Sequence, residues 1–198
     1  MEQYFAFQWH ITDACDQRCK HCYIFSENSH LPIAEMSFAG MRKVVDNCEE
    51  MCGRLLRIPY FYITGGDPLL HKDFWRLLGL LKSKGISFSL MGNPFHLTGE
   101  VCQRLYACGC ERYQLSLDGL KHTHDSVRKS GSFDATLEKI PCIRNAGMRS
   151  VIMTTVSGTN IDEIPRLIDL VVEHEVDVFA FARYCPTRGV IDAFEKSA

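Results

Sequence analysis

The chain has 198 residues, of which 46% are hydrophobic and 23% are charged, and its formal net charge is −2. This composition is typical of one folded domain, and it excludes a disordered chain and any electrostatic attraction to nucleic acid or an anionic membrane. No apolar run approaches the roughly 18 residues of a membrane span, and the N-terminus lacks the pattern of a secretory signal. We therefore expect a cytoplasmic protein whose ten cysteines are free thiols or metal ligands.

Strand-like and helix-like segments alternate along the chain. Aromatic and β-branched runs predict strands over residues 4–12, 56–64, 86–91, 111–117, 149–156 and 176–184. Apolar periodicity predicts helices over residues 38–52, 74–84, 99–107, 133–146 and 161–173. Ser37 and Thr98 are predicted N-caps, and Asn160 with Glu163 a capping box. The alternation predicts an α/β fold of parallel strands joined by right-handed helical crossovers.

Three cysteines, Cys15, Cys19 and Cys22, follow the first predicted strand within eight residues. They lie on the loop that leaves the C-terminal end of this strand, where α/β folds place their chemistry. Thiolates this close in sequence can converge on one metal centre with little loop-closure entropy. Zinc sites and fully ligated iron–sulfur clusters take four protein ligands, so three thiolates predict a cluster with one iron left open.

The other cysteines beside predicted helices are expected to pack in the core, because cysteine is among the most buried residue types. These are Cys48, Cys52, Cys102, Cys108, Cys110 and Cys142.

The Cys-x3-Cys-x2-Cys spacing of Cys15, Cys19 and Cys22 resembles the signature of the radical S-adenosylmethionine (SAM) enzymes. In that family the three cysteines bind a [4Fe–4S] cluster, and the open iron chelates the amine and carboxylate of SAM. Reductive cleavage of SAM then yields a 5′-deoxyadenosyl radical that abstracts hydrogen from a substrate. The resemblance implies these two cofactors here, and the six predicted strand–helix units match the family's partial (β/α)6 TIM-like barrel.

Two further strand ends resemble motifs of this family. Gly65-Gly66-Asp67-Pro68 is similar to a Gly-Gly-Glu-Pro motif that receives the methionine amino group of SAM, with an aspartate in place of the usual glutamate. Two glycines let backbone carbonyls approach a ligand closely, and an ammonium needs such acceptors. Asn93 resembles the asparagine of a Thr-Asn-Gly turn that lines the SAM pocket.

The fourth and sixth strands end on similar motifs. The resemblance implies that Ser116 and Arg128 contact the ribose and carboxylate of SAM, since a guanidinium suits a carboxylate in shape and charge. Asp118 and His124, between them, are expected to tie the loop after strand four. Arg183 begins a segment that resembles one in enzymes with a C-terminal SPASM domain, where the backbone near this strand reads the adenine edge. Tyr23 holds the place of a residue whose backbone does likewise.

The resemblance therefore implies a radical SAM enzyme of the SPASM-related, maturase type that acts on a peptide or protein side chain. A ferredoxin or flavodoxin is the expected reductant. We expect residues 1–198 to be the SAM-cleaving core of a longer enzyme, because the sequence stops inside what would be the sixth helix.

Three alternatives remain open from the sequence. One is a radical SAM enzyme that acts on a tetrapyrrole or small molecule. Another is an electron-transfer module, favoured by Cys185-Pro186, because bacterial ferredoxins follow a ligand cysteine with proline. The third is a structural zinc site of the three cysteines with His10, His21 or His30.

Overall fold

The fold is a parallel six-stranded sheet covered by helices, seen in a computed structural model that describes residues 3–25 and 34–185. The strands follow one another across the sheet in the order of the sequence, and each pairs in parallel with the next. Their bounds are β1 Tyr4–His10, β2 Ile58–Thr64, β3 Phe88–Met91, β4 Cys110–Ser116, β5 Arg149–Val156 and β6 Val178–Arg183.

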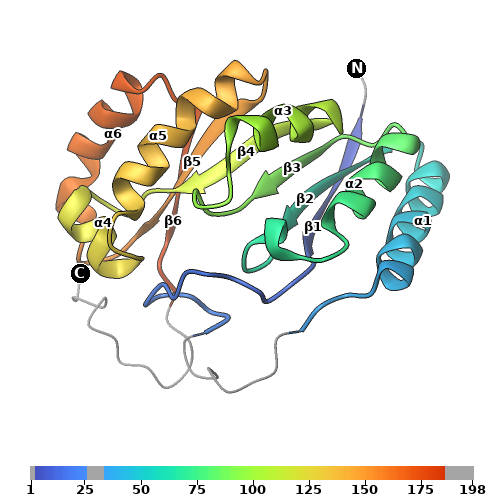
Figure 1. Ribbon diagram of the computed structural model, residues 1–198, viewed down its shortest axis with the longest axis horizontal. Coiled ribbons are helices and arrows are strands. Elements are labelled where there is room, and N and C mark those ends of the chain that lie inside the picture. The colour runs from blue at the N-terminus through green and yellow to red at the C-terminus, as the bar shows by residue number, and fades with distance from the viewer. Residues whose placement is uncertain (1–2, 26–33, 186–198) are drawn as a thin grey trace.

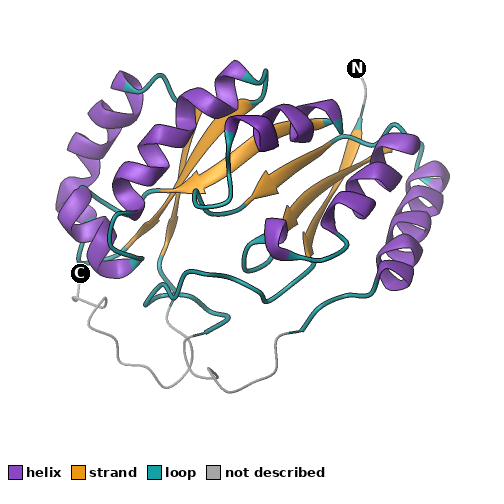
Figure 2. Cartoon of the chain, viewed as in Figure 1, coloured by secondary structure: helices purple, strands orange, loops and turns teal. Residues whose placement is uncertain are grey.

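Six α-helices among the described residues connect these strands. They are α1 Phe38–Arg54, α2 Phe74–Ser83, α3 Gly99–Ala107, α4 Lys121–Val127, α5 Ser132–Asn145 and α6 Ile164–Glu173, with short 3-10 turns η1 Pro68–Leu70 and η2 Ile161–Glu163. The sheet curls into a half-barrel whose outer face the helices cover (Figures 1 and 2). The predicted α/β fold, a partial (β/α)6 TIM-like barrel with parallel strands, is confirmed.

The core lies between the outer face of the sheet and the helices. Alternate residues of each strand point to opposite faces, so Phe61 and Ile63 of β2 and Tyr113 and Leu115 of β4 are fully buried in it. The intervening residues of the same strands face the concave side.

The C-terminal ends of the strands gather the loops of the site at one edge of the sheet. In Figure 1 the strand arrowheads point toward the edge along which the blue loop after β1 runs. The strand registers align ends of neighbouring strands, with His10 opposite Thr64 and Val156 opposite Arg183. Residues far apart in sequence therefore meet where each strand stops.

The structure agrees with two of the three predicted helix N-termini. Ser37 and Thr98 cap their helices by accepting hydrogen bonds from the backbone N–H groups of Gly40 and Val101, so both predicted N-caps are confirmed. The capping box of Asn160 and Glu163 is wrong.

Tertiary contacts occupy both side chains of that expected capping box. The Asn160 amide donates to the backbone oxygens of Asp118 and Thr155. The Glu163 carboxylate accepts from the Leu120 N–H at 2.7 Å and from the Thr123 hydroxyl at 2.6 Å. The Glu163 contacts hold the start of α4, a helix at a place where the sequence predicts a loop.

The expected incomplete sixth helix, the end of the Arg183 segment and His30 fall at least partly outside the described residues. The assignment of residues 1–198 to the core of a longer enzyme therefore stays a prediction. Within the described ranges, every helix is too short or too polar to cross a membrane.

Candidate functional site

A cavity of about 380 Å³ lies at the carboxyl edge of the sheet. Its wall combines the loop after β1 with the ends of β2, β3, β4, β5 and β6. Every predicted site residue except Asp67 lines it, namely Cys15, Cys19, Cys22, Tyr23, Gly65, Gly66, Asn93, Ser116, Arg128 and Arg183. The fold thus brings into one space residues that the sequence separates by more than 150 positions.

The three thiols are partly exposed, and neighbouring polar groups hold two of them. The Cys15 sulfur accepts from the Gln17 backbone N–H at 3.4 Å and lies 3.9 Å from the Asn93 amide nitrogen. The Cys19 sulfur lies 3.5 Å from the Gln17 side-chain oxygen and 3.8 Å from Arg128 Nη1. Burial raises the pKa of both thiols, although the Arg128 charge lowers that of Cys19. A bound metal would have to supply the charge that favours their thiolate forms.

The spacing of these sulfurs argues against a single zinc ion. Tetrahedral zinc with bonds of about 2.3 Å needs sulfurs about 3.8 Å apart. In the described part of the chain, the three cysteines do not come within 4.8 Å of one another, either alone or with a histidine. His10 instead contacts Asp13 at 2.7 Å, and His21 lies 3.3 Å from Asp118. A cluster distributes its thiolates over several irons, so it does not require the three sulfurs to meet at one ion.

A different trio does come together beside the cavity. Ligand atoms of Asp16, Asp67 and His96 all lie within 4.8 Å of one another. His96 Nε2 is 3.3 Å from the Asp16 carboxylate, and the Lys129 ammonium is 4.0 Å from it. The Lys129 ammonium thus partly offsets the Asp16 charge, and Asn93 also donates to this carboxylate.

The Gly65-Gly66 turn has a packing role that the sequence reasoning missed. The N–H groups of Gly66 and Asp67 donate to the backbone oxygens of Thr12 and Ala14, each at 2.7 Å. A Cβ on Gly65 would lie 2.3 Å from the Thr12 oxygen, and one on Gly66 would lie 2.3 Å from the Ala14 oxygen. Both glycines are therefore required for the end of β2 to lie against the start of the cysteine loop.

Asp67 lies behind the cavity wall and is fully buried. One carboxylate oxygen caps η1 by accepting from the Leu69 N–H at 3.1 Å, and the other is buried without a hydrogen bond among the described residues. Burial raises the pKa of this carboxyl to about 6. The predicted contact between Asp67 and the methionine ammonium is therefore not direct in this arrangement, because the carboxylate does not reach the cavity.

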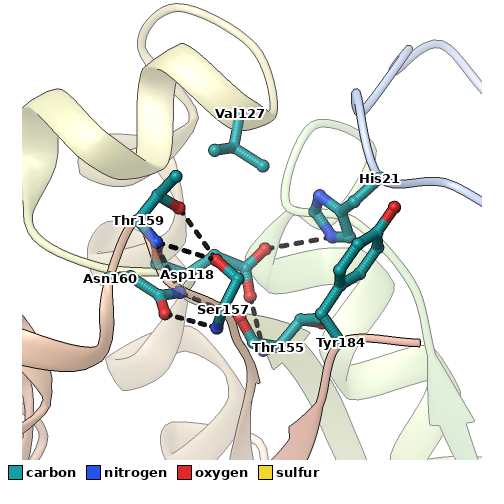
Figure 3. A pocket seen from close by; sticks show the side chains of 8 residues that line it. All are labelled: His21, Asp118, Val127, Thr155, Ser157, Thr159, Asn160 and Tyr184. Atoms are coloured by element: carbon teal, nitrogen blue, oxygen red, sulfur yellow. Dashed lines mark hydrogen bonds and ion pairs between the residues drawn. The ribbon is translucent and has the colours of Figure 1, made fainter. Parts of the chain in front are cut away.

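Asp118 is the centre of a buried polar network beneath the cysteine loop (Figure 3). One of its oxygens accepts from Arg128 Nε at 2.5 Å and lies 3.3 Å from His21 Nε2, and the other accepts from the Thr155 N–H at 2.8 Å. Burial opposes its ionisation, but Arg128, then His21 and the Thr155 N–H, hold the pKa of Asp118 below its ordinary value. The cavity beside it has a volume of about 10 Å³, room for at most about one water.

His124 completes the anchor of α4. Its Nδ1 accepts the backbone N–H of Asp118 at 3.0 Å, and burial, followed by the Arg128 charge, lowers its pKa to about 4. The prediction that Asp118 and His124 tie this segment is confirmed.

Sequence reasoning missed several cavity-lining side chains, among them Met91, Gln114, Thr155 and Tyr184. A signal for Gln114 was available, because it lies two residues before Ser116 and so faces the same side of β4. Cys185 also reaches the wall and is exposed. Of the cysteines expected in the core, Cys52, Cys102 and Cys110 are buried, and the other three pack partly against it.

Comparison with known proteins decides the family. The sequence matches the radical SAM superfamily over residues 9–171. The chain belongs to this superfamily. The cofactors that the sequence predicted, a [4Fe–4S] cluster and SAM, are those of this family.

Two curated relatives show the range of the match. The AdoMet-dependent heme synthase of Methanosarcina barkeri is 31% identical over 167 residues, which cover 83% of this chain and 46% of the relative. The mycofactocin maturase MftC of Mycolicibacterium smegmatis is 29% identical over 168 residues, which cover 84% of this chain and 41% of the maturase. A maturase is thus among the relatives, in line with the predicted resemblance to the maturase-type branch, and the chain spans less than half the length of these relatives.

The fold also matches solved structures. SuiB of Streptococcus suis bound to S-adenosylmethionine superposes with a TM-score of 0.75 at 17% identity, over 95% of this chain and 42% of SuiB. At this identity the likeness concerns the fold.

Proposed function

We propose that this radical SAM core binds a [4Fe–4S] cluster through Cys15, Cys19 and Cys22 and cleaves SAM in the 380 Å³ cavity. The observation that carries the proposal is that all three thiols share this cavity with the ends of the strands. Such an arrangement leaves one side of a bound cluster facing an open space. When bound, the cluster and SAM together supply a 5′-deoxyadenosyl radical that abstracts hydrogen.

The chain's own residues would hold SAM at several points. The Gly65-Gly66 turn offers backbone acceptors for the methionine ammonium, and Asp67 would support this turn from behind the cavity wall as the cap of η1. Ser116 and Arg128 offer donors for the ribose and carboxylate, and Asn93 supports Cys15 from the end of β3. Tyr23 and Arg183 both line the cavity, and their backbones would meet the adenine.

We further propose that the substrate is a peptide or protein side chain. Support comes from the similarity to a mycofactocin maturase and from the fold shared with SuiB, which has been solved bound to its precursor peptide SuiA. The cavity opens on the concave face of the half-barrel, where Met91 and Gln114 present uncharged side chains. A tetrapyrrole is the second candidate, supported by the 31% identity to a heme synthase.

A ferredoxin or flavodoxin is the proposed electron donor, and the cytoplasm the proposed location, because free thiols and an open cluster need a reducing compartment.

The proposal is tested by anaerobic reconstitution of the chain with iron and sulfide, followed by SAM and dithionite. We expect the absorption of an iron–sulfur cluster and the release of 5′-deoxyadenosine. A protein that takes up the cluster without cleaving SAM would be an electron carrier. Deuterium transfer into 5′-deoxyadenosine from a labelled precursor peptide, compared with a labelled porphyrin, distinguishes the two substrate classes.

The SAM-binding role of Arg128 has a test of its own. Arg128→Ala removes a charge-assisted partner worth about 1.5–3 kcal/mol, which corresponds to a roughly ten- to hundredfold weaker Kd for SAM. An unchanged Kd at equal cluster content would show that Arg128 does not bind SAM.

A further inference from the structure

The contact between Arg128 and the cysteine loop is built from two elements that are distant in sequence. Arg128 follows directly on α4, and its Nη1 lies 3.8 Å from the Cys19 sulfur. The neighbouring residues fix this approach, since the Lys20 N–H donates to the Val127 backbone oxygen at 2.8 Å. One backbone hydrogen bond thus sets the end of α4 against the loop and brings the Arg128 and Cys19 side chains together.

Asp118 holds the opposite edge of the same guanidinium. Its carboxylate binds Arg128 Nε at 2.5 Å, and the two side chains are only 2% and 15% exposed. The Thr155 N–H and His21 fix the carboxylate in turn. Arg128 cannot turn its Nε edge toward a ligand without leaving a buried carboxylate uncompensated, which is costly. Its charge is therefore held in place whether or not SAM is bound.

We infer that Asp118 and Arg128 lie just outside the ligands of the cluster and set its reduction potential. Arg128 raises the potential, and Asp118 lowers it while holding Arg128 in position. The inference rests on the proposed cluster site and adds a role that SAM binding does not require. Reduction adds one negative charge to a cluster. A fixed positive charge beside a ligand sulfur favours the reduced state, and a fixed negative charge opposes it. Burial of both groups limits solvent screening.

The two members of the pair should therefore act with opposite signs. Arg128→Gln removes the positive charge and leaves Asp118, so the midpoint potential should shift to more negative values. Asp118→Asn removes the negative charge, keeps the shape of the side chain and leaves Arg128, so the potential should shift to more positive values. The double variant removes both charges and should return most of the way to the wild-type potential. A residue that only holds the fold together would not give this pattern.

The measurement is a redox titration of the reconstituted protein followed by electron paramagnetic resonance, with iron content and circular dichroism recorded for each variant. Asp125→Asn is the matched control. Asp125 lies in α4, between Asp118 and Arg128 in the sequence, but its carboxylate accepts hydrogen bonds from the backbone N–H groups of Gly131 and Phe133. We expect its loss to leave the potential unchanged.

Shifts of opposite sign for Arg128→Gln and Asp118→Asn support the inference. Shifts of the same sign, or no shift in either variant, overturn it. If the Arg128→Gln variant does not hold the cluster, the Asp118→Asn variant decides alone. A shift of its midpoint potential to more negative values, or no shift, contradicts the inference. Failure of the wild-type chain to take up a cluster would overturn the proposed function and the inference together. A wild type that binds the cluster and cleaves SAM, with unresponsive variants, would overturn the inference alone.

Discussion

The side-chain amide of Asn93 donates a hydrogen bond of 2.7 Å to the carboxylate of Asp16, which lies 77 positions earlier in the chain. This contact joins the end of β3 to the cysteine loop, next to the Cys15 sulfur. A hydrogen bond to a charged, partly buried acceptor contributes about 1.5–3 kcal/mol. The loop is thus fastened at its first cysteine independently of any cofactor.

Replacing Asn93 should therefore loosen the cluster. We expect Asn93→Ala to speed the loss of iron from the reconstituted protein to a chelator, because Cys15 and Asp16 lose their shared partner. Asn145→Ala, at an exposed position at the end of α5, is the matched control and should leave the release rate unchanged. Equal rates for the two variants would show that the Asn93 contact does not support the cluster.

Cluster ligation is predicted for three cysteines alone. Cys15→Ala, Cys19→Ala and Cys22→Ala should each abolish the iron–sulfur absorption, because thiolates are the ligands that these clusters take. Cys185→Ala is the informative comparison, since Cys185 is exposed and lies on the same cavity wall. It should retain full absorption. Loss of absorption in Cys185→Ala would mean that a fourth thiolate closes the cluster, as in an electron carrier.

The close packing of Gly66 gives a prediction about stability. Gly66→Ala would bring a Cβ against the Ala14 backbone oxygen, so the cysteine loop must move. Such overpacking costs about 1–3 kcal/mol in the free energy of unfolding. Gly79→Ala in α2 meets nothing within 4 Å and should instead stabilise the protein by about 0.5–1 kcal/mol. Urea unfolding of both variants tests this contrast. Equal changes in the free energy of unfolding for Gly66→Ala and Gly79→Ala would contradict it.

His124 predicts how stability depends on pH. Its pKa is lowered to about 4 in the folded protein, whereas an unfolded histidine titrates near about 6.5. Between these values the unfolded state binds more protons, so stability falls as pH falls through this window. The contribution of His124 should fall by about 2 kcal/mol between pH 7 and pH 5, while Asp67, whose pKa is raised to about 6, changes stability in the opposite direction, so the comparison with a His124 variant isolates this contribution. The variant His124→Asn, which keeps an acceptor for the Asp118 N–H, should remove most of this dependence in urea unfolding at the two pH values.

Much of the fold could be predicted because the alternation of strands and helices is a local pattern. The three cysteines and the glycine turn were also readable, since each motif occupies a few consecutive residues. The capping box was wrong because Glu163 binds Leu120 and Thr123, and no local pattern reports a partner about 40 positions away. The helix α4 was missed for a related reason, because His124 and Glu163 hold it through tertiary contacts.

The site shows the same limit at Arg128 and Asp67. The sequence indicated which ligand groups would suit their charges. It did not indicate that Asp118 holds one edge of the guanidinium, or that Asp67 lies behind the cavity wall as the cap of η1. Side-chain direction and burial depend on packing between elements, and a single sequence carries little information about either.

The sequential order of the strands has a consequence for how the protein is made. Each strand pairs with the next one along the chain, so the sheet can grow as the ribosome delivers it. The cysteine loop is different, because Cys19 contacts Arg128, 109 positions later. The thiols are synthesised early but obtain their supporting residues only after β4 and α4 have left the ribosome. We therefore expect stable iron loading only after β4 and α4 have formed, and until then the three ligand thiols lack the contact to Arg128.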